Sequence, residues 1–168
     1  MTTVEESTFE LTDEQVEAFL ADGFVIIPEI IDPDLARRAL DRFDPMFAGQ
    51  FETGLYPDGW NWNPKRDDPS LTRQICNGWR ADDTIAAQVL SERTGRIAAQ
   101  LMGYGGARIL QDNCLWKPPG ARSLGMHQDG SFADYLVPPE MITCWVALDD
   151  TQAGGGTVEH VKGSHLWP

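Results

Sequence analysis

The segment GMHQDGSF, residues 125–132, places a histidine and an aspartate two positions apart in a chain that has only three histidines. In an extended backbone, residues two apart project from the same face, so His127 and Asp129 would present an imidazole and a carboxylate side by side. Gln128 would face the opposite way. With a second histidine from a neighbouring strand, the pair would make a facial triad on Fe(II) that leaves positions open for further ligands. A histidine hydrogen-bonded to an aspartate is also a common structural pair, and the two residues alone leave both interpretations open.

The other two imidazoles, His160 and His165, lie in the segment TVEHVKGSH. Either would complete a set of three ligands, but a lone histidine more often faces solvent or supports a turn, and we expect that of both. A second interpretation joins His160 to His127 and Asp129 as a Zn²⁺ or Mn²⁺ site of a cupin-like hydrolase or isomerase. The proline- and glycine-rich stretch KPPGARSLG precedes the motif and predicts a loop, where functional residues concentrate.

The net charge argues against two classes of binding partner, nucleic acids and anionic membranes. The 26 acidic and 13 basic residues give a net charge of −13, which repels nucleic-acid phosphates and anionic membranes. No run approaches the ~20 apolar residues of a membrane span, and the start MTTVEESTFE lacks the basic and apolar parts of a signal peptide. We therefore expect a cytoplasmic protein, folded as one domain, that binds neither nucleic acid nor membrane.

The three cysteines, Cys76, Cys114 and Cys144, are odd in number and show no CxxC spacing. This pattern is unlike a zinc site or a disulfide framework. We expect free, buried thiols.

Three stretches before residue 103 predict helices. Residues 11–23 begin with a capping box and end in a glycine, and residues 31–47 carry an aspartate cap, a proline at the first helical position and apolar residues at helical spacing up to Pro45. Residues 82–102 show the same helical spacing of apolar residues, with a break in the middle. Gly103 is expected to end this helical region.

The remaining segments predict loop and sheet. Residues 24–30, FVIIPEI, favour an edge strand, and residues 49–80 carry turn residues and three tryptophans without a period, which is typical of a long ordered loop. Four later runs favour strands: ARILQDNCLWK, SLGMHQDGSF, EMITCWVAL and TVEHVKGSH. We predict an α+β fold with a mainly β core, a double-stranded β-helix (jelly roll) with N-terminal helices, of which four strands supply about half. Residues 1–10 would be flexible, 11–103 mostly helical and 104–168 strand-rich.

The run from Lys117 to Pro168, which contains HQDG, AGGG and GSH, resembles the phytanoyl-CoA dioxygenase family of Fe(II)- and 2-oxoglutarate-dependent oxygenases. The opening LTDEQVEAFLADGFVIIPEII, residues 11–31, is similar to the usual start of that family, though less specifically. The resemblance implies a cupin-like fold and an oxidoreductase that hydroxylates a small organic molecule with O₂ while 2-oxoglutarate is decarboxylated to succinate.

The resemblance also implies roles for particular residues. His127 and Asp129 match the first two iron ligands of the family. Gln128 is implied to contact the 2-oxoglutarate cosubstrate and Trp145 to line its site, and contact with substrate or cosubstrate is implied for Gln111 and Asn113. For Gln111 and Asn113, ordinary polarity on one strand face explains their types equally well.

The chain departs from the family pattern after the motif. In relatives a distal histidine ligand, and an arginine that binds the far carboxylate of 2-oxoglutarate, follow the region that matches GSH. From Asp129 on, this sequence has no arginine, and Lys162 is its only base. We therefore expect the third ligand and the carboxylate partner beyond residue 168, with a non-catalytic or metal-binding-only chain as the alternative. Unpaired sheet edges would then favour homo-oligomers.

Overall fold

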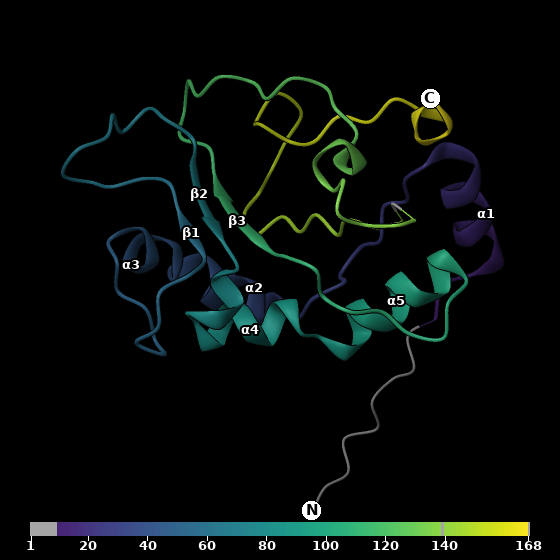
Figure 1. The fold of residues 1–168 in the computed structure, drawn as a ribbon, viewed down its shortest axis with the longest axis horizontal. Helices are drawn as coiled ribbons and strands as arrows, with labels where there is room; N and C mark the ends of the chain where they lie inside the picture. The colour runs from purple at the N-terminus through teal and green to yellow at the C-terminus, as the bar shows by residue number, and fades with distance from the viewer. Residues whose placement is uncertain (1–9, 139, 168) are drawn as a thin grey trace, which may run out of the picture.

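The computed structural model describes residues 10–138 and 140–167 (Figure 1), so the predicted flexible segment lies outside the described residues except for Glu10. Five α-helices, three short strands and three 3₁₀ helices follow one another in that part of the chain. In chain order they are α1 (Asp13–Asp22), α2 (Pro33–Asp41), α3 (Phe43–Phe47), β1 (Gly59–Trp60), β2 (Arg73–Cys76), η1 (Gly78–Arg80), α4 (Asp83–Val89), α5 (Glu92–Met102), β3 (Asn113–Trp116), η2 (Asp129–Phe132) and η3 (Ser164–Leu166).

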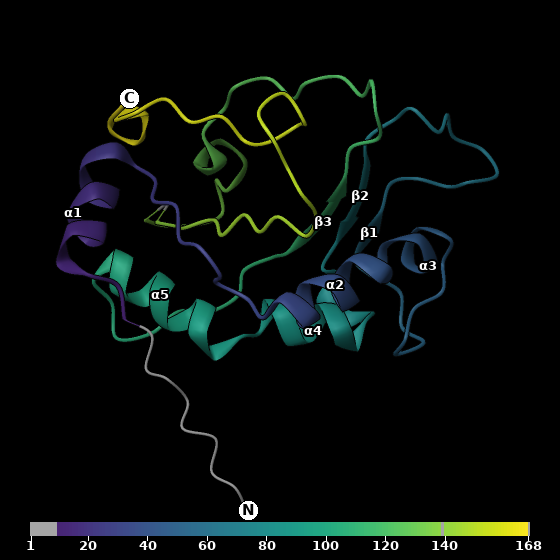
Figure 2. The same cartoon turned by 180° about the vertical axis from the view of Figure 1, so that it is seen from behind.

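The three strands form one antiparallel sheet in the order β1-β2-β3, with Ile75 opposite Cys114. Helices α2, α4 and α5 run along one side of the molecule, and the irregular segments from residue 117 onward run along the opposite side (Figures 1 and 2). The α+β class is therefore confirmed.

Local signals in the sequence account for the helix ends. Thr12 accepts from the Gln15 amide and the Gln15 side chain accepts from the Thr12 amide, so the predicted capping box is formed, and Ser91 caps α5 at the predicted break. Gly103 ends α5 in the left-handed conformation, with φ 68°. The helix predicted over residues 31–47 is divided into two, because α2 ends at Asp41 and α3 begins at Phe43. Pro45 does not end the helical region, since it lies in the first turn of α3, where an amide hydrogen has no helical partner anyway.

The larger core cluster gathers between the sheet and the helices. Its buried members are Ala39, Phe43, Met46, Phe47, Trp62, Ile75, Ile85 and Cys114. Beside it the Arg73 guanidinium lies between two indole rings, 3.9 Å from the Trp62 centroid and 4.3 Å from that of Trp116. The predicted loop over residues 49–80 is thus wrong in part, since it holds β1 and β2. The strand RQIC was missed because four residues are too few to show an alternating pattern.

A second apolar cluster joins Leu11 and α1 to α5. Leu11, Ile97 and Leu101 are buried in it, and the Gln100 carboxamide bonds both the amide (2.9 Å) and the carbonyl (3.0 Å) of Leu11. Residues 24–30 form no strand, contrary to prediction. Val25, Ile27 and Ile30 pack on this cluster, Ile26 is exposed, and the backbone of the segment pairs with no strand among the described residues.

The strand-rich half was also predicted wrongly. Of the four runs, the first forms β3, the second becomes coil and the 3₁₀ helix η2, and residues 140–148 and 157–165 form no strand. A β-branched sequence becomes a strand only where a neighbour pairs with its backbone groups. Those runs have no such neighbour among the described residues, so the core is not mainly β and the described residues show no double-stranded β-helix.

The cysteines follow the prediction in part. All three are free, but Cys114 alone is buried, Cys76 is half-buried and Cys144 is exposed. Burial raises the pKa of the Cys114 thiol, which makes the thiolate needed for metal binding unfavourable. In the part of the chain that the structure describes, no helix is long and apolar enough to cross a membrane.

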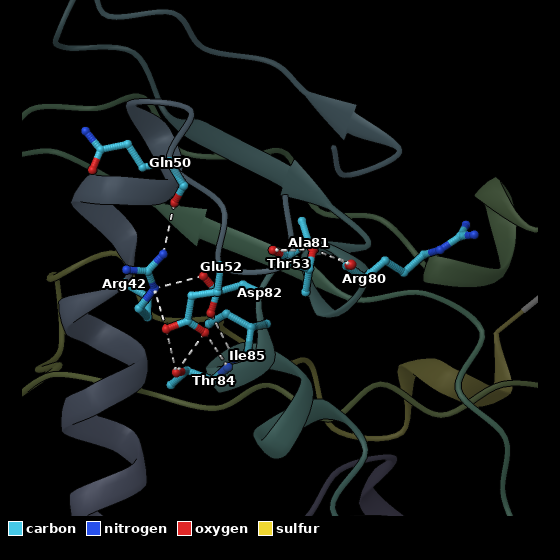
Figure 3. A network of polar contacts seen from close by, with 9 residues as sticks. All are labelled: Arg42, Gln50, Glu52, Thr53, Arg80, Ala81, Asp82, Thr84 and Ile85. Atoms are coloured by element: carbon cyan, nitrogen blue, oxygen red, sulfur yellow. Dashed lines mark hydrogen bonds and ion pairs between the residues drawn. The ribbon is translucent and has the colours of Figure 1, made fainter. Parts of the chain in front are cut away.

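A buried ionic network holds α2 and α3 against α4 (Figure 3). Arg42 Nε lies 2.8 Å from the carboxylate of Asp82, which is fully buried and also accepts from the Ile85 amide at the start of α4. Glu52 lies 3.4 Å from Arg42 Nε and accepts from the Thr84 amide. Burial raises the pKa of the Asp82 carboxyl above its ordinary value, against the opposing effect of its Arg42 and Ile85 partners.

Replacing Asp82→Ala should lower the free energy of unfolding by about 3 kcal/mol, because it leaves Arg42 without its buried partner and removes the cap of α4. Urea denaturation measures this change. The control is Asp34→Ala, which breaks the exposed Arg37–Asp34 pair and should leave the midpoint nearly unchanged. Equal midpoints for the two variants would contradict the role given to the network.

Candidate metal centre

The backbone between the two candidate ligands is extended. Gln128 has φ −103° and ψ 131° and stands at the start of η2. This conformation sends the side chains of His127 and Asp129 to one side, where Nε2 of the imidazole lies 3.3 Å from Oδ1 of the carboxylate. The structure therefore brings together the pair that the sequence singled out.

Each member of the pair is oriented by a further hydrogen bond. Nδ1 of His127 lies 2.8 Å from the Gly125 carbonyl oxygen, and Oδ2 of Asp129 accepts from the Thr143 hydroxyl at 2.5 Å. Because a carbonyl oxygen only accepts, Nδ1 carries the ring hydrogen in this contact, and in the neutral ring Nε2 keeps its lone pair. A lone pair and a carboxylate oxygen then face each other across 3.3 Å. Two ligands of one cation face each other in this way, and a protonated ring would make the same contact an ion pair.

The segment that supplies Thr143 is anchored at two points. Ile142 packs on the Leu11 cluster, and Leu148 packs on the larger core cluster around Ile75. The irregular chain between them is thereby held across the face of the molecule. Both core clusters thus contribute to the position of the Asp129 carboxylate.

The pair is accessible. The side chains of His127 and Asp129 are 33% and 47% exposed, and the Phe132 ring meets the imidazole edge-on at a centroid distance of 5.3 Å. An ion held here would keep open positions for small ligands.

No third ligand joins the pair within the described residues, where no cluster of three histidine, cysteine or acidic side chains suits a metal ion. His160 stacks on Phe24 with centroids 4.9 Å apart, and His165 Nε2 lies 3.2 Å from the Leu20 carbonyl oxygen. The set His127, Asp129 and His160, on which the hydrolase or isomerase interpretation depends, is therefore not assembled.

The predicted cosubstrate residues fall into two places. Asn113 Oδ1 accepts from Gln111 (3.2 Å), from Gln74 (2.8 Å) and from the Cys76 thiol (3.1 Å). Gln74 and Cys76 lie on the same face of the sheet as Asn113, because Cys76 and Asn113 are register partners. Within residues 10–138 and 140–167, no hydrogen bond connects this amide cluster with the His127–Asp129 pair.

The other two predicted contacts lie nearer the motif. Trp145 is 45% exposed and follows Thr143 by two residues, on the segment that reaches Asp129. The Gln128 carboxamide leaves the opposite side of the motif and donates to the carbonyl oxygens of Ser164 (2.8 Å) and Trp167 (3.4 Å).

Thr143 was not predicted from the sequence. A signal existed, because Thr143 and Trp145 are two residues apart and would share a face in an extended segment. The Gln74 and Cys76 contacts gave no such signal, since they depend on strand pairing across more than 35 residues.

Comparisons with known proteins give a family whose model spans this part of the chain. The family model described as phytanoyl-CoA dioxygenase (PhyH) matches residues 19–168. Ectoine dioxygenase of Stutzerimonas stutzeri (strain A1501) is 26% identical over 162 residues, which cover 90% of this chain and 50% of that protein. The chain thus spans about half the length of this curated relative. No solved structure matches the chain significantly.

Replacing Thr143→Val should weaken divalent metal binding roughly tenfold, because residues that orient a ligand typically contribute that much to affinity. Thr151→Val is the matched control, since that hydroxyl bonds only its neighbour Asp149. Equilibrium dialysis with Co²⁺ measures the difference. A dissociation constant for Thr143→Val equal to that of Thr151→Val would contradict the orienting role.

Proposed function

The chain belongs to the phytanoyl-CoA dioxygenase family, and we propose that its His127–Asp129 pair holds Fe(II) in a 2-oxoglutarate-dependent dioxygenase. The observation that carries the proposal is the 3.3 Å approach of imidazole Nε2 to carboxylate Oδ1, with the other atom of each group already hydrogen-bonded. The substrate is proposed to be a small organic molecule, which becomes hydroxylated. The dioxygenase activity of the relative supports the reaction class.

The geometry suits two ligands of one ion. Nitrogen and oxygen ligands lie ~2.1 Å from a divalent metal, so two of them at a right angle are ~3 Å apart. The separation of 3.3 Å in the protein is close to that value. The carbonyl of Gly125 and the hydroxyl of Thr143 are the kind of partner that fixes the orientation of metal ligands.

When bound together, Fe(II) and 2-oxoglutarate supply the oxidation chemistry, in which one atom of O₂ enters succinate, CO₂ is released, and the other oxygen atom enters a C–H bond of the substrate. The residues of this chain would bind the ion and the cosubstrate and orient them. His127 and Asp129 would hold one side of the ion and leave its other positions to a third protein ligand, the cosubstrate and O₂. We propose that Trp145 shields the cosubstrate from water on the side of Thr143.

The amide cluster around Asn113 is the proposed site for polar contact with 2-oxoglutarate. Gln111 and Gln74 both donate to the single oxygen of Asn113, which leaves the Asn113 nitrogen for an external acceptor. A cosubstrate carboxylate is such an acceptor. Contact between Gln128 and the cosubstrate stays a prediction, because its carboxamide nitrogen donates to two backbone carbonyls.

The complete double-stranded β-helix belongs to the same proposal. Because the match covers half of the ectoine dioxygenase, we propose that polypeptide outside these 168 residues supplies the third ligand, the carboxylate partner of 2-oxoglutarate and the missing strands. A second copy of the chain is one source of such strands, so a homo-oligomer remains part of the proposal. A cytoplasmic location is proposed from the three free thiols, which reducing compartments preserve.

Anaerobic titration with Fe(II) and 2-oxoglutarate tests the proposal through the visible charge-transfer band of a chelated complex. We expect the band from the protein with its third ligand supplied, by an oligomer or by the longer polypeptide, and its loss in His127→Ala and Asp129→Ala. Asp150→Ala removes an exposed acid from the same half of the chain and should keep the band.

Exposure of the loaded protein to air distinguishes turnover from binding. Release of succinate supports a dioxygenase, and a band without succinate supports the metal-binding-only alternative. If Asp129→Ala and Asp150→Ala give the same band as the unaltered chain, the proposed metal site is wrong.

A further inference from the structure

The C-terminal turn is fastened to the end of α1. The Gly163 amide donates to the Asp22 carbonyl at 2.8 Å, and the Lys162 ammonium lies 2.6 Å from the Asp22 carboxylate. His165 Nε2 lies 3.2 Å from the Leu20 carbonyl oxygen. Both views place this turn beside α1 (Figures 1 and 2). We call the contacts between residues 20–24 and 160–167 the α1 clasp.

Two ring contacts complete the clasp. His160 stacks on Phe24 with an angle of 12° between the rings. The His165 ring covers Gly23, where a Cβ atom would lie 2.3 Å from Nδ1 of that ring. Glycine is therefore required at position 23 by packing, in addition to its φ of 84°. The two histidines outside the motif are thus both used to hold the C-terminal turn.

Gln128 joins the clasp to the metal pair. Its carboxamide nitrogen has two hydrogens, and the carbonyl oxygens of Ser164 and Trp167 lie 2.8 and 3.4 Å from it. These carbonyls belong to the turn that contains His165. Because Gln128 stands between His127 and Asp129 in the chain, a rotation of its backbone would move both ligands relative to each other.

We propose that Gln128 is a positioning residue, through which the α1 clasp sets the angle between the His127 and Asp129 ligands. The inference rests on the proposed metal site and adds a residue, outside the two ligands, that determines their relative orientation. The motif is otherwise held by few contacts: the side chains of the pair are one-third to one-half exposed, and Phe132 beside them is 72% exposed. Two hydrogen bonds to one turn fix the orientation of the carboxamide and hence of the residue that carries it.

The coupling is reciprocal. If the clasp favours the geometry that binds metal, metal binding must stabilise the clasp by the same free energy. Exchange of the Gly163 amide hydrogen, which bonds the Asp22 carbonyl, reports the clasp without reference to the metal. This amide should exchange faster in Gln128→Leu than in the unaltered chain, and more slowly in the unaltered chain once metal is added.

Titration of the 168-residue chain with Co²⁺ tests the positioning role, because the d–d bands of the ion report ligand geometry. Gln128→Leu and Gly23→Ala should weaken Co²⁺ binding roughly tenfold and shift the bands. The chain offers a matched control for each. Gly103→Ala introduces the same left-handed strain at the end of α5 but meets no atom within 4 Å, and Gln152→Leu removes an exposed carboxamide. Both controls should bind like the unaltered chain.

The outcomes separate the two proposals. An unaltered chain that does not bind Co²⁺ overturns the proposed metal site, and the positioning role with it. An unaltered chain that binds, with Gln128→Leu and Gly23→Ala giving the same affinity and bands as their controls, overturns the positioning role alone. If Gly23→Ala does not fold, His165→Ala removes the ring without backbone strain and is expected to weaken binding as Gln128→Leu does.

Discussion

The extended backbone at Gln128 is the constraint on which the site depends. It sends His127 and Asp129 to one side, where their facing atoms are 3.3 Å apart, and Gln128 to the other, where it meets the C-terminal turn. A helical backbone at this residue would turn neighbours two positions apart to different faces and separate the pair. The same alternation that creates the two-ligand arrangement therefore also gives the motif its attachment to the rest of the protein.

The helical half of the chain positions this motif indirectly, through the core clusters on which the segment carrying Thr143 packs. The buried Arg42–Asp82 pair holds α2 and α3 on α4, and the core that they complete holds Leu148. The cluster of α1 and α5 holds Ile142. The segment between these two anchors carries the hydroxyl that binds Asp129. Residues that are polar and exposed are thus placed by apolar contacts made elsewhere, which is why an irregular segment can keep a defined geometry.

Local chemistry made part of this structure predictable. The capping box at Thr12 and the left-handed Gly103 act within one helical turn, and these helix ends were predicted from them, whereas the break that Ser91 caps was predicted without its capping role. Side-chain alternation across HQD predicted for the same reason that His127 and Asp129 lie on one side of the backbone. Strands depend on partners far away in the sequence, so RQIC was missed and runs such as EMITCWVAL were predicted as strands without a neighbour to pair with. The contacts of Thr143 and Gln128 span 14 and 36 residues, and spacing alone does not reveal them.

The central claim is that His127 and Asp129 are ligands of one metal ion. Anomalous diffraction at the iron edge, from crystals of the protein soaked anaerobically in Fe(II), tests it most directly. The account predicts an anomalous peak ~2.1 Å from both Nε2 of His127 and Oδ1 of Asp129. A peak at other residues only, or a hydrogen-bonded pair without a peak at saturating Fe(II), would contradict it.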